Sequence, residues 1–228
     1  MIDYRQFRLR RINEPQFRHI KMLLFWPVFG LMFFAVERLI PRTYFPVYCP
    51  LDDRIPFNEL FLIPYLFWFV FLIGAHVYTF FTDVQAFRRL MRFVMITYGT
   101  ALVVFLIWPT CQLLRPAAFA RDNFLTRFMA AFYAFDTNTN VCPSLHVCGS
   151  FAAALAFADT RRFSSPAWKT VLFVIAGLIS VSTVFVKQHS IIDMVCGLLL
   201  SGFAWLAVYV LPEKHGTKKP CPQVLSVI

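Results

Sequence analysis

Two histidines and one aspartate are the side chains of this chain best suited to acid–base or nucleophilic chemistry. His189 and Asp193, in the stretch KQHSIID (187–193), are four residues apart and share a face if the segment is helical. The carboxylate can then accept a hydrogen bond from one ring nitrogen, which leaves the other nitrogen as a nucleophile. His146, in VCPSLHV (141–147), can hold or deliver a proton near neutral pH. This pattern predicts a nucleophile and a separate acid–base group.

The residues around these histidines predict a site for an anion. Pro143 is expected in a first helical turn, where its missing N–H costs nothing. The free N–H groups of that turn, including that of Leu145, and the helix dipole attract negative charge. Ser144 adds a hydroxyl donor, and Arg115 and Lys187 supply positive charge for a phosphoryl group. We therefore expect a phosphate cradle.

These groups are set in a strongly apolar chain. Of its 228 residues 59% are hydrophobic, against about 45–50% in soluble domains. Six apolar runs approach the roughly 20 residues that cross a bilayer, and a spanning segment satisfies its backbone as a helix. The sequence therefore predicts an all-α, six-transmembrane-helix bundle, with spans at Met22–Ile40, Leu60–Phe81, Leu90–Trp108, Val141–Ala158, Ala167–Val186 and Ile191–Leu211.

The distribution of charge predicts the orientation of the bundle. The chain carries a formal net charge of +10, and most of its 22 Lys and Arg lie before span one, in alternate connections and after span six. The positive-inside rule makes that side cytoplasmic, with both termini. The short loops favour a bacterial inner membrane. Basic charge without an aromatic stacking platform argues against nucleic acid as a partner.

With this orientation, Arg115, the start of span four and the start of span six all lie on the outer face, so three segments bring polar groups together there. Ionisable groups at such depth mark functional sites by default. The chain is divided into a basic cytoplasmic segment at 1–21, which is an interfacial helix or a loose tail, one membrane domain at 22–211, and a polar, disordered tail at 212–228.

Smaller features complete this picture. Phe124–Phe135 is expected to form a short amphipathic helix on the outer surface, and the short Lys187–Ser190 joint makes its flanking helices antiparallel neighbours. The three outer cysteines allow one disulfide, whose pairing the sequence does not give; they are Cys49, Cys111 and Cys142. The remaining histidines are interpreted as structural; they are His19, His76 and His215.

A metal site is the alternative chemical interpretation. Its ligands would be the two histidines, Asp193 and either Cys142 or Cys148. Arg115 and Lys187 count against this alternative, because they would repel a cation.

The spacing of these residues resembles the type-2 phosphatidic acid phosphatase superfamily of membrane lipid phosphatases. The resemblance covers residues 108–197 and has three parts in order. The matching positions are Arg115-Pro116 in WPTCQLLRP, then Pro143, Ser144 and His146, then Ser182, His189 and Asp193 in STVFVKQHSIID.

Three positions depart from the family pattern. Trp108 replaces a lysine, Leu145 replaces a glycine, and Thr183 replaces an arginine, so two cationic phosphate ligands are absent. Lys187 is near enough to His189 in sequence to replace one of them. Such drift is similar to the branch of inositol phosphorylceramide synthases and sphingomyelin synthases, which transfer a phosphorylated headgroup to an alcohol.

The resemblance implies a mechanism. His189 attacks phosphorus and becomes phosphohistidine, Asp193 orients it, and His146 protonates the leaving group and then activates water. No metal or other cofactor is needed. The phosphate ligands would be Arg115, Ser144, Lys187, Ser182 and the N–H groups that begin at Leu145, with Asp136 and Asn140 ordering the preceding loop.

The resulting expectation is an integral membrane lipid phosphatase acting on a phosphomonoester or pyrophosphate. Its partners are a phosphorylated lipid and the bilayer; the sequence does not set its oligomeric state. Phosphatidic acid, phosphatidylglycerol phosphate and polyprenyl pyrophosphates all fit. Two alternatives stay open: a transferase that moves a phosphorylated headgroup to a lipid alcohol, and a non-catalytic protein that binds anionic lipid.

Overall fold

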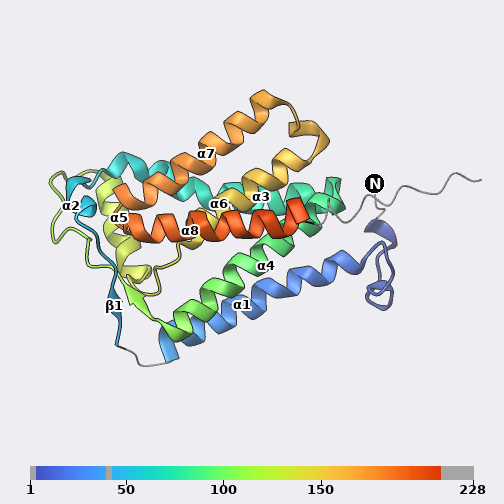
Figure 1. Ribbon diagram of the computed structural model, residues 1–228, viewed down its shortest axis with the longest axis horizontal. Coiled ribbons are helices and arrows are strands. Elements are labelled where there is room, and N and C mark those ends of the chain that lie inside the picture. The colour runs from blue at the N-terminus through green and yellow to red at the C-terminus, as the bar shows by residue number, and fades with distance from the viewer. Residues whose placement is uncertain (1–3, 40–42, 212–228) are drawn as a thin grey trace, which may run out of the picture.

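The computed structural model describes residues 4–39 and 43–211, which form a bundle of long helices with the longer connecting loops gathered at one end (Figure 1). The 212–228 tail and His215 lie outside the described residues. The long helices are α1 (Phe25–Phe34), α3 (Leu62–Thr82), α4 (Val84–Ile107), α6 (Leu145–Asp159), α7 (Pro166–Phe185) and α8 (Ile191–Trp205).

Shorter elements extend or connect these helices. A 3-10 helix, Arg18–Leu24, leads into α1, and π-helical turns, Ala35–Leu39 and Leu206–Val210, follow α1 and α8. The other 3-10 turns are Tyr4–Gln6, Leu9–Arg11, Glu59–Phe61 and Arg161–Phe163. Helices α2 (Leu51–Arg54) and α5 (Phe124–Phe135) lie in the loops, as does a parallel pair of two-residue strands, β1 (Phe45–Pro46) and β2 (Thr110–Cys111).

The all-α prediction is confirmed, whereas the count of six spans is not. Five helical segments are long and apolar enough to cross a membrane: Arg18–Leu39, Glu59–Thr82, Val84–Ile107, Pro166–Phe185 and Ile191–Val210. The expected fourth span, Val141–Ala158, is the shorter helix α6, with 15 residues. At 1.5 Å per residue it covers about 22 Å, less than the roughly 30 Å of a bilayer core.

Helix α6 is the centre of the bundle despite its length. It packs against α3, α4, α7 and α8, and its alanines at 152, 153, 154 and 156 are fully buried. A Cβ added at Gly149 would lie 2.7 Å from the Tyr98 hydroxyl oxygen, and one added at Gly197 would lie 3.0 Å from the Ser144 carbonyl oxygen. These small residues let α4 and α8 approach α6 closely, which fixes the start of α6 beside the start of α8.

Local sequence signals explain several helix boundaries. Ser165 caps α7, which begins at Pro166, and Asn123 forms a capping box with Thr126 at the start of α5. Helix α5 matches the expected short helix residue for residue. In the basic N-terminal segment, His19 is buried and shares a 2.8 Å hydrogen bond with the Tyr4 hydroxyl. Within α3, His76 Nδ1 lies 2.8 Å from the Leu72 carbonyl oxygen.

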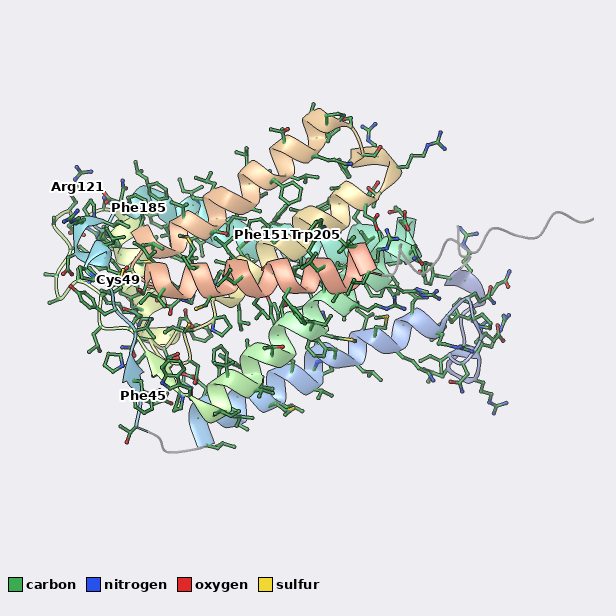
Figure 2. The ribbon with its side chains drawn as sticks, in the orientation of Figure 1. Phe45, Cys49, Arg121, Phe151, Phe185 and Trp205 are labelled. Atoms are coloured by element: carbon green, nitrogen blue, oxygen red, sulfur yellow. The ribbon has the colours of Figure 1, made fainter. Side chains whose placement is uncertain are left out.

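The loops that carry α2, α5 and β1 cluster at the end of the bundle opposite the N-terminal turns (Figure 1). Cys49 and Arg121, labelled in Figure 2, lie at this loop end. The strand pair aligns Phe45 with Thr110 and ties the loop before α2 to the loop after α4. The family-pattern segments 108–116, 141–146 and 187–193 meet here.

Candidate active site

A small cavity of about 80 Å³ opens at the loop end of the bundle, where three distant segments converge. The start of α6, the α7–α8 joint and the loop after α5 supply most of its wall, with one side chain from α1. Its lining residues are Phe33, Asp136, Thr137, Thr139, Asn140, Val141, Leu145, His146, Gln188 and His189. Both predicted catalytic histidines therefore face one cavity.

His189 is oriented by a buried carboxylate. Its Nδ1 lies 3.3 Å from Asp193 Oδ2, and Asp193 is fully buried in the first turn of α8. An ionised carboxylate only accepts hydrogen bonds, so it selects the tautomer with a proton on Nδ1, and in the neutral form of that ring the lone pair is on Nε2. The backbone N–H of Ser190 donates to the same Asp193 oxygen at 2.9 Å. This arrangement leaves His189 Nε2 as a potential nucleophile.

His146 lies opposite His189, with 5.7 Å between the ring centroids. Its ring is stacked on Tyr65 at 4.6 Å and packed against Trp68 at 4.4 Å, both from α3. Its Nε2 has no hydrogen-bond partner among the described residues. The two aromatic side chains hold the imidazole in place without occupying its nitrogens. Sequence reasoning missed Tyr65 and Trp68, since neither differs in type from the aromatic residues around it.

Arg115 lies behind the cavity and holds its wall together. Its guanidinium donates to the Tyr133, Asp136 and Thr137 carbonyl oxygens at 2.8–2.9 Å and to Gln188 Oε1 at 2.6 Å. It also lies 4.5 Å over the Tyr133 ring. Burial lowers the pKa of Arg115, an effect that nearby Asp136 opposes. In this structure the guanidinium is engaged by protein acceptors and lies outside the cavity lining.

Gln188 connects Arg115 to the cavity. Its amide nitrogen donates to Asp136 Oδ2 at 2.9 Å, while its oxygen accepts from Arg115. Burial raises the pKa of Asp136, although the positive charge of Arg115 opposes that effect. Sequence reasoning missed Gln188; its position next to His189 was the available signal.

Lys187, Ser182 and Ser144 were expected to bind phosphate, but they lie outside the cavity lining. The Lys187 ammonium donates to the Asp52 carbonyl oxygen at 2.7 Å, and burial lowers its pKa. Lys187 adopts φ 53°, the left-handed conformation, and this turn directs its side chain toward α2. Ser182 is fully buried, and its hydroxyl donates to the Ile179 carbonyl oxygen at 2.6 Å.

The start of α6 lies two residues later than expected. Pro143 does not occupy the first helical turn: it follows a cis peptide bond from Cys142, and the helix begins at Leu145 with Ser144 as its N-cap. The Ser144 N–H donates to the Asp193 carbonyl oxygen at 3.1 Å. Its buried hydroxyl has no partner among the described residues. First-turn N–H groups have no partners within their own helix, so the predicted anion site is displaced to Leu145 and the next residues.

Glu37, at the end of the first span, holds the loop that forms one wall of the cavity. Its carboxylate accepts hydrogen bonds from the side chains of Thr137, Thr139 and Asn140. Asn140 adopts φ 53°, and its N–H donates to the Thr110 carbonyl oxygen at 2.6 Å. Sequence reasoning missed Glu37, although an acidic residue at the end of an apolar run was a usable signal.

The described residues contain no group of three or more His, Cys, Asp or Glu side chains placed to hold a metal ion. The five cysteines within residues 4–39 and 43–211 are free, so the outer cysteines are unpaired in this structure.

The family model of the PAP2 superfamily matches residues 89–217, more than half of the 228-residue chain. The chain therefore belongs to the PAP2 superfamily, and the resemblance seen in the sequence is confirmed. Membership gives it a lipid phosphatase or phosphotransferase type of function at the membrane, and phosphohistidine is a general feature of the family. No curated protein and no solved structure matches the chain.

Proposed function

We propose that the protein hydrolyses a phosphomonoester or pyrophosphate of a membrane lipid through a phosphohistidine at His189, with no metal taking part. The observation that carries the proposal is the pairing of His189, backed by Asp193 at 3.3 Å, with His146 across one cavity at 5.7 Å between ring centroids. A nucleophile, its orienting carboxylate and a separate acid–base group are the parts that such a reaction requires.

The proposed reaction has two steps. His189 Nε2 attacks phosphorus and forms an N–P bond as the P–O bond to the lipid breaks, and His146 gives its proton to the leaving oxygen. Water then attacks phosphorus while His146 takes its proton, and the N–P bond breaks to release phosphate. The first-turn N–H groups from Leu145 onward and the Ser144 hydroxyl are the proposed ligands of the phosphate oxygens.

The proposed orientation places this cavity at the outer face of a bacterial inner membrane. Arg88, Arg89 and Arg92 lie at the start of α4, and the N-terminal turns that carry further arginines lie at the end opposite the cavity loops. Positive charge at one end of a bundle marks its cytoplasmic side. We also propose that residues 22–211 form one membrane domain between a basic N-terminal segment and the C-terminal tail.

The test is phosphate release by detergent-purified protein in EDTA, across phosphatidic acid, phosphatidylglycerol phosphate and polyprenyl pyrophosphate. Wild type should release phosphate from at least one lipid. His189→Ala should abolish release and His146→Ala should reduce it, with unchanged expression and elution volume. Wild-type rates in His189→Ala would contradict the proposal. Lipid binding without turnover would instead indicate the non-catalytic alternative.

Headgroup transfer to a lipid alcohol is the second candidate, and the charges around the cavity favour it. Asp136 lines the cavity, Glu37 binds its wall, and the guanidinium of Arg115 is already engaged by four protein acceptors. Such surroundings repel a doubly charged phosphomonoester more than a singly charged phosphodiester. This candidate predicts turnover of phosphodiester lipids only when diacylglycerol or ceramide is added as acceptor.

A further inference from the structure

Asp52, in the loop between the first span and α3, is fully buried against the joint that carries His189. Its Oδ2 accepts from the Ser190 hydroxyl at 2.6 Å and from the Cys49 N–H at 2.9 Å. Its Oδ1 accepts from the Ile191 N–H at 2.9 Å. The residue lies outside the range that the family model matches, 89–217.

Asp52 contacts residues that precede His189 in the sequence and residues that follow it. Before the histidine, the Lys187 ammonium donates to the Asp52 carbonyl oxygen at 2.7 Å. After it, Ser190 is the N-cap of α8, and its hydroxyl also accepts from the Ile192 N–H at 3.2 Å. A negative charge at this position is favoured by the helix dipole as well as by the N–H groups. One residue of a distant loop thus fixes the backbone on either side of the histidine.

The N-cap residue Ser190, which Asp52 holds, also affects the contact between His189 and Asp193. The Ser190 N–H and His189 Nδ1 bind the same Asp193 oxygen, so a shift of Ser190 changes the distance between the imidazole and its carboxylate. At 3.3 Å that contact is already long for a hydrogen bond. It therefore depends on where the N-cap is held.

We propose that Asp52 is a positioning residue for the His189 nucleophile, acting through Ser190 and the start of α8. It touches neither the cavity nor a reacting atom. Its effect is to keep Ser190 and Asp193 placed so that His189 Nδ1 stays protonated and Nε2 stays directed at the cavity. The proposal rests on the proposed phosphoryl transfer for its kinetic consequence, but its structural consequence is independent of any substrate.

The kinetic test compares Asp52→Ala and Asp52→Asn with wild type on the lipid that the wild type turns over fastest. Misplacing a catalytic group by about 1 Å can cost about a hundredfold in rate. We expect Asp52→Ala to lower kcat about ten- to hundredfold with KM changed by less than about threefold. Asp52→Asn keeps one oxygen for the Ile191 N–H and should lose less. The matched control is Asp53→Asn, an exposed neighbour that should retain the wild-type kcat.

A coupled variant shows whether Asp52 acts through the N-cap. If it does, Ser190→Ala combined with Asp52→Ala should lose about as much kcat as the more damaging single change, because both remove the same contact. Losses that multiply would overturn the route through Ser190.

A substrate-free measurement separates this proposal from the proposed function. The ¹⁵N chemical shifts of the His189 ring, assigned by their loss in His189→Gln, should show a protonated Nδ1 in the wild type and a mixture of tautomers in Asp52→Asn and Asp52→Ala. Wild-type tautomers and wild-type kcat in both Asp52 variants would overturn the proposal. A tautomer change in a protein that turns over no lipid would support the role of Asp52 while contradicting the proposed function.

Discussion

Replacing Glu37 by glutamine should loosen the cavity wall by a predictable amount. The carboxylate accepts from the hydroxyls of Thr137 and Thr139 through one oxygen and from the Asn140 amide through the other. Glutamine keeps one oxygen for the two threonines but turns an N–H₂ group toward the Asn140 amide, which is also a donor. One hydrogen bond to a charged group is lost, a cost of about 1.5–3 kcal/mol.

That cost should appear as faster local opening of the loop. Other hydrogen bonds also hold this loop, among them the Asn140 N–H to the Thr110 carbonyl oxygen at 2.6 Å, the Gln112 N–H to the Asn138 carbonyl oxygen at 2.9 Å and the Arg115 guanidinium to the Thr137 carbonyl oxygen at 2.8 Å. About 1.4 kcal/mol is a factor of ten in an equilibrium. Hydrogen exchange of these amides should therefore accelerate about ten- to hundredfold in Glu37→Gln, without a matching change in the core of α6.

Peptide-level hydrogen exchange in detergent measures this effect. The control is Glu14→Gln, the same chemical change at a half-buried carboxylate far from the cavity that pairs with Arg11 and Gln16. The control should leave exchange at 137–142 unchanged. Wild-type exchange at 137–142 in Glu37→Gln would refute the assignment of Glu37 as the anchor of this wall.

Three further changes test the groups around the cavity. Burial raises the pKa of Asp136 above its ordinary value of 3.8, so the folded state binds more protons and becomes less stable as pH rises from about that value; Asp136→Asn should raise the unfolding temperature at pH 7, with the gain shrinking toward pH 4, and a pH-independent gain would contradict this cause. Trp68→Ala should lower kcat about tenfold by freeing the His146 ring, whereas Trp68→Phe should keep most of the wild-type kcat. Equal kcat values for Trp68→Ala and wild type in steady-state assays would contradict a role for this ring packing. Arg115→Lys should lower kcat/KM more than tenfold, because an ammonium cannot serve four acceptors in a planar arrangement, and a loss below threefold would contradict the clamp.

Much of the helical architecture was predictable because apolar run length and helix caps are local signals. Helix α5 and the start of α8 agree with the expected boundaries. The count of six spans is not confirmed. Hydropathy does not show that α6 is buried by other helices at its alanines and at Gly149, and a helix covered in this way does not need the length of a lipid-exposed span. The sequence predicted a start of α6 that is two residues too early. Proline favours a first helical turn only where the chain continues from it directly into the helix, and here the helix begins at Leu145.

The grouping of His146, His189 and Asp193 was predictable from spacing and topology, and the family was predictable from the resemblance of three motif segments. The direction in which long side chains point was not predictable from the sequence. Lys187 lies two residues from His189, yet its left-handed backbone turns it to Asp52. The carboxylates that hold the cavity loops are distant in sequence from the residues that they bind. Glu37 is 100 to 103 residues from its three partners, and Asp52 is 138 residues from Ser190, so no local pattern joins them.

The most direct test of the central claim is to look for the covalent intermediate itself. Wild-type protein would be mixed in EDTA with the lipid that it turns over fastest, quenched in alkali within one turnover, and digested for mass spectrometry. The account predicts a phosphoryl group on His189 in the wild type. The group should be absent in Asp193→Asn quenched at the same time. In His146→Ala the amount of phosphorylated His189 should be high relative to the rate at which phosphate is released. Turnover with no phosphoryl group on His189, or with the group on another residue, would contradict it.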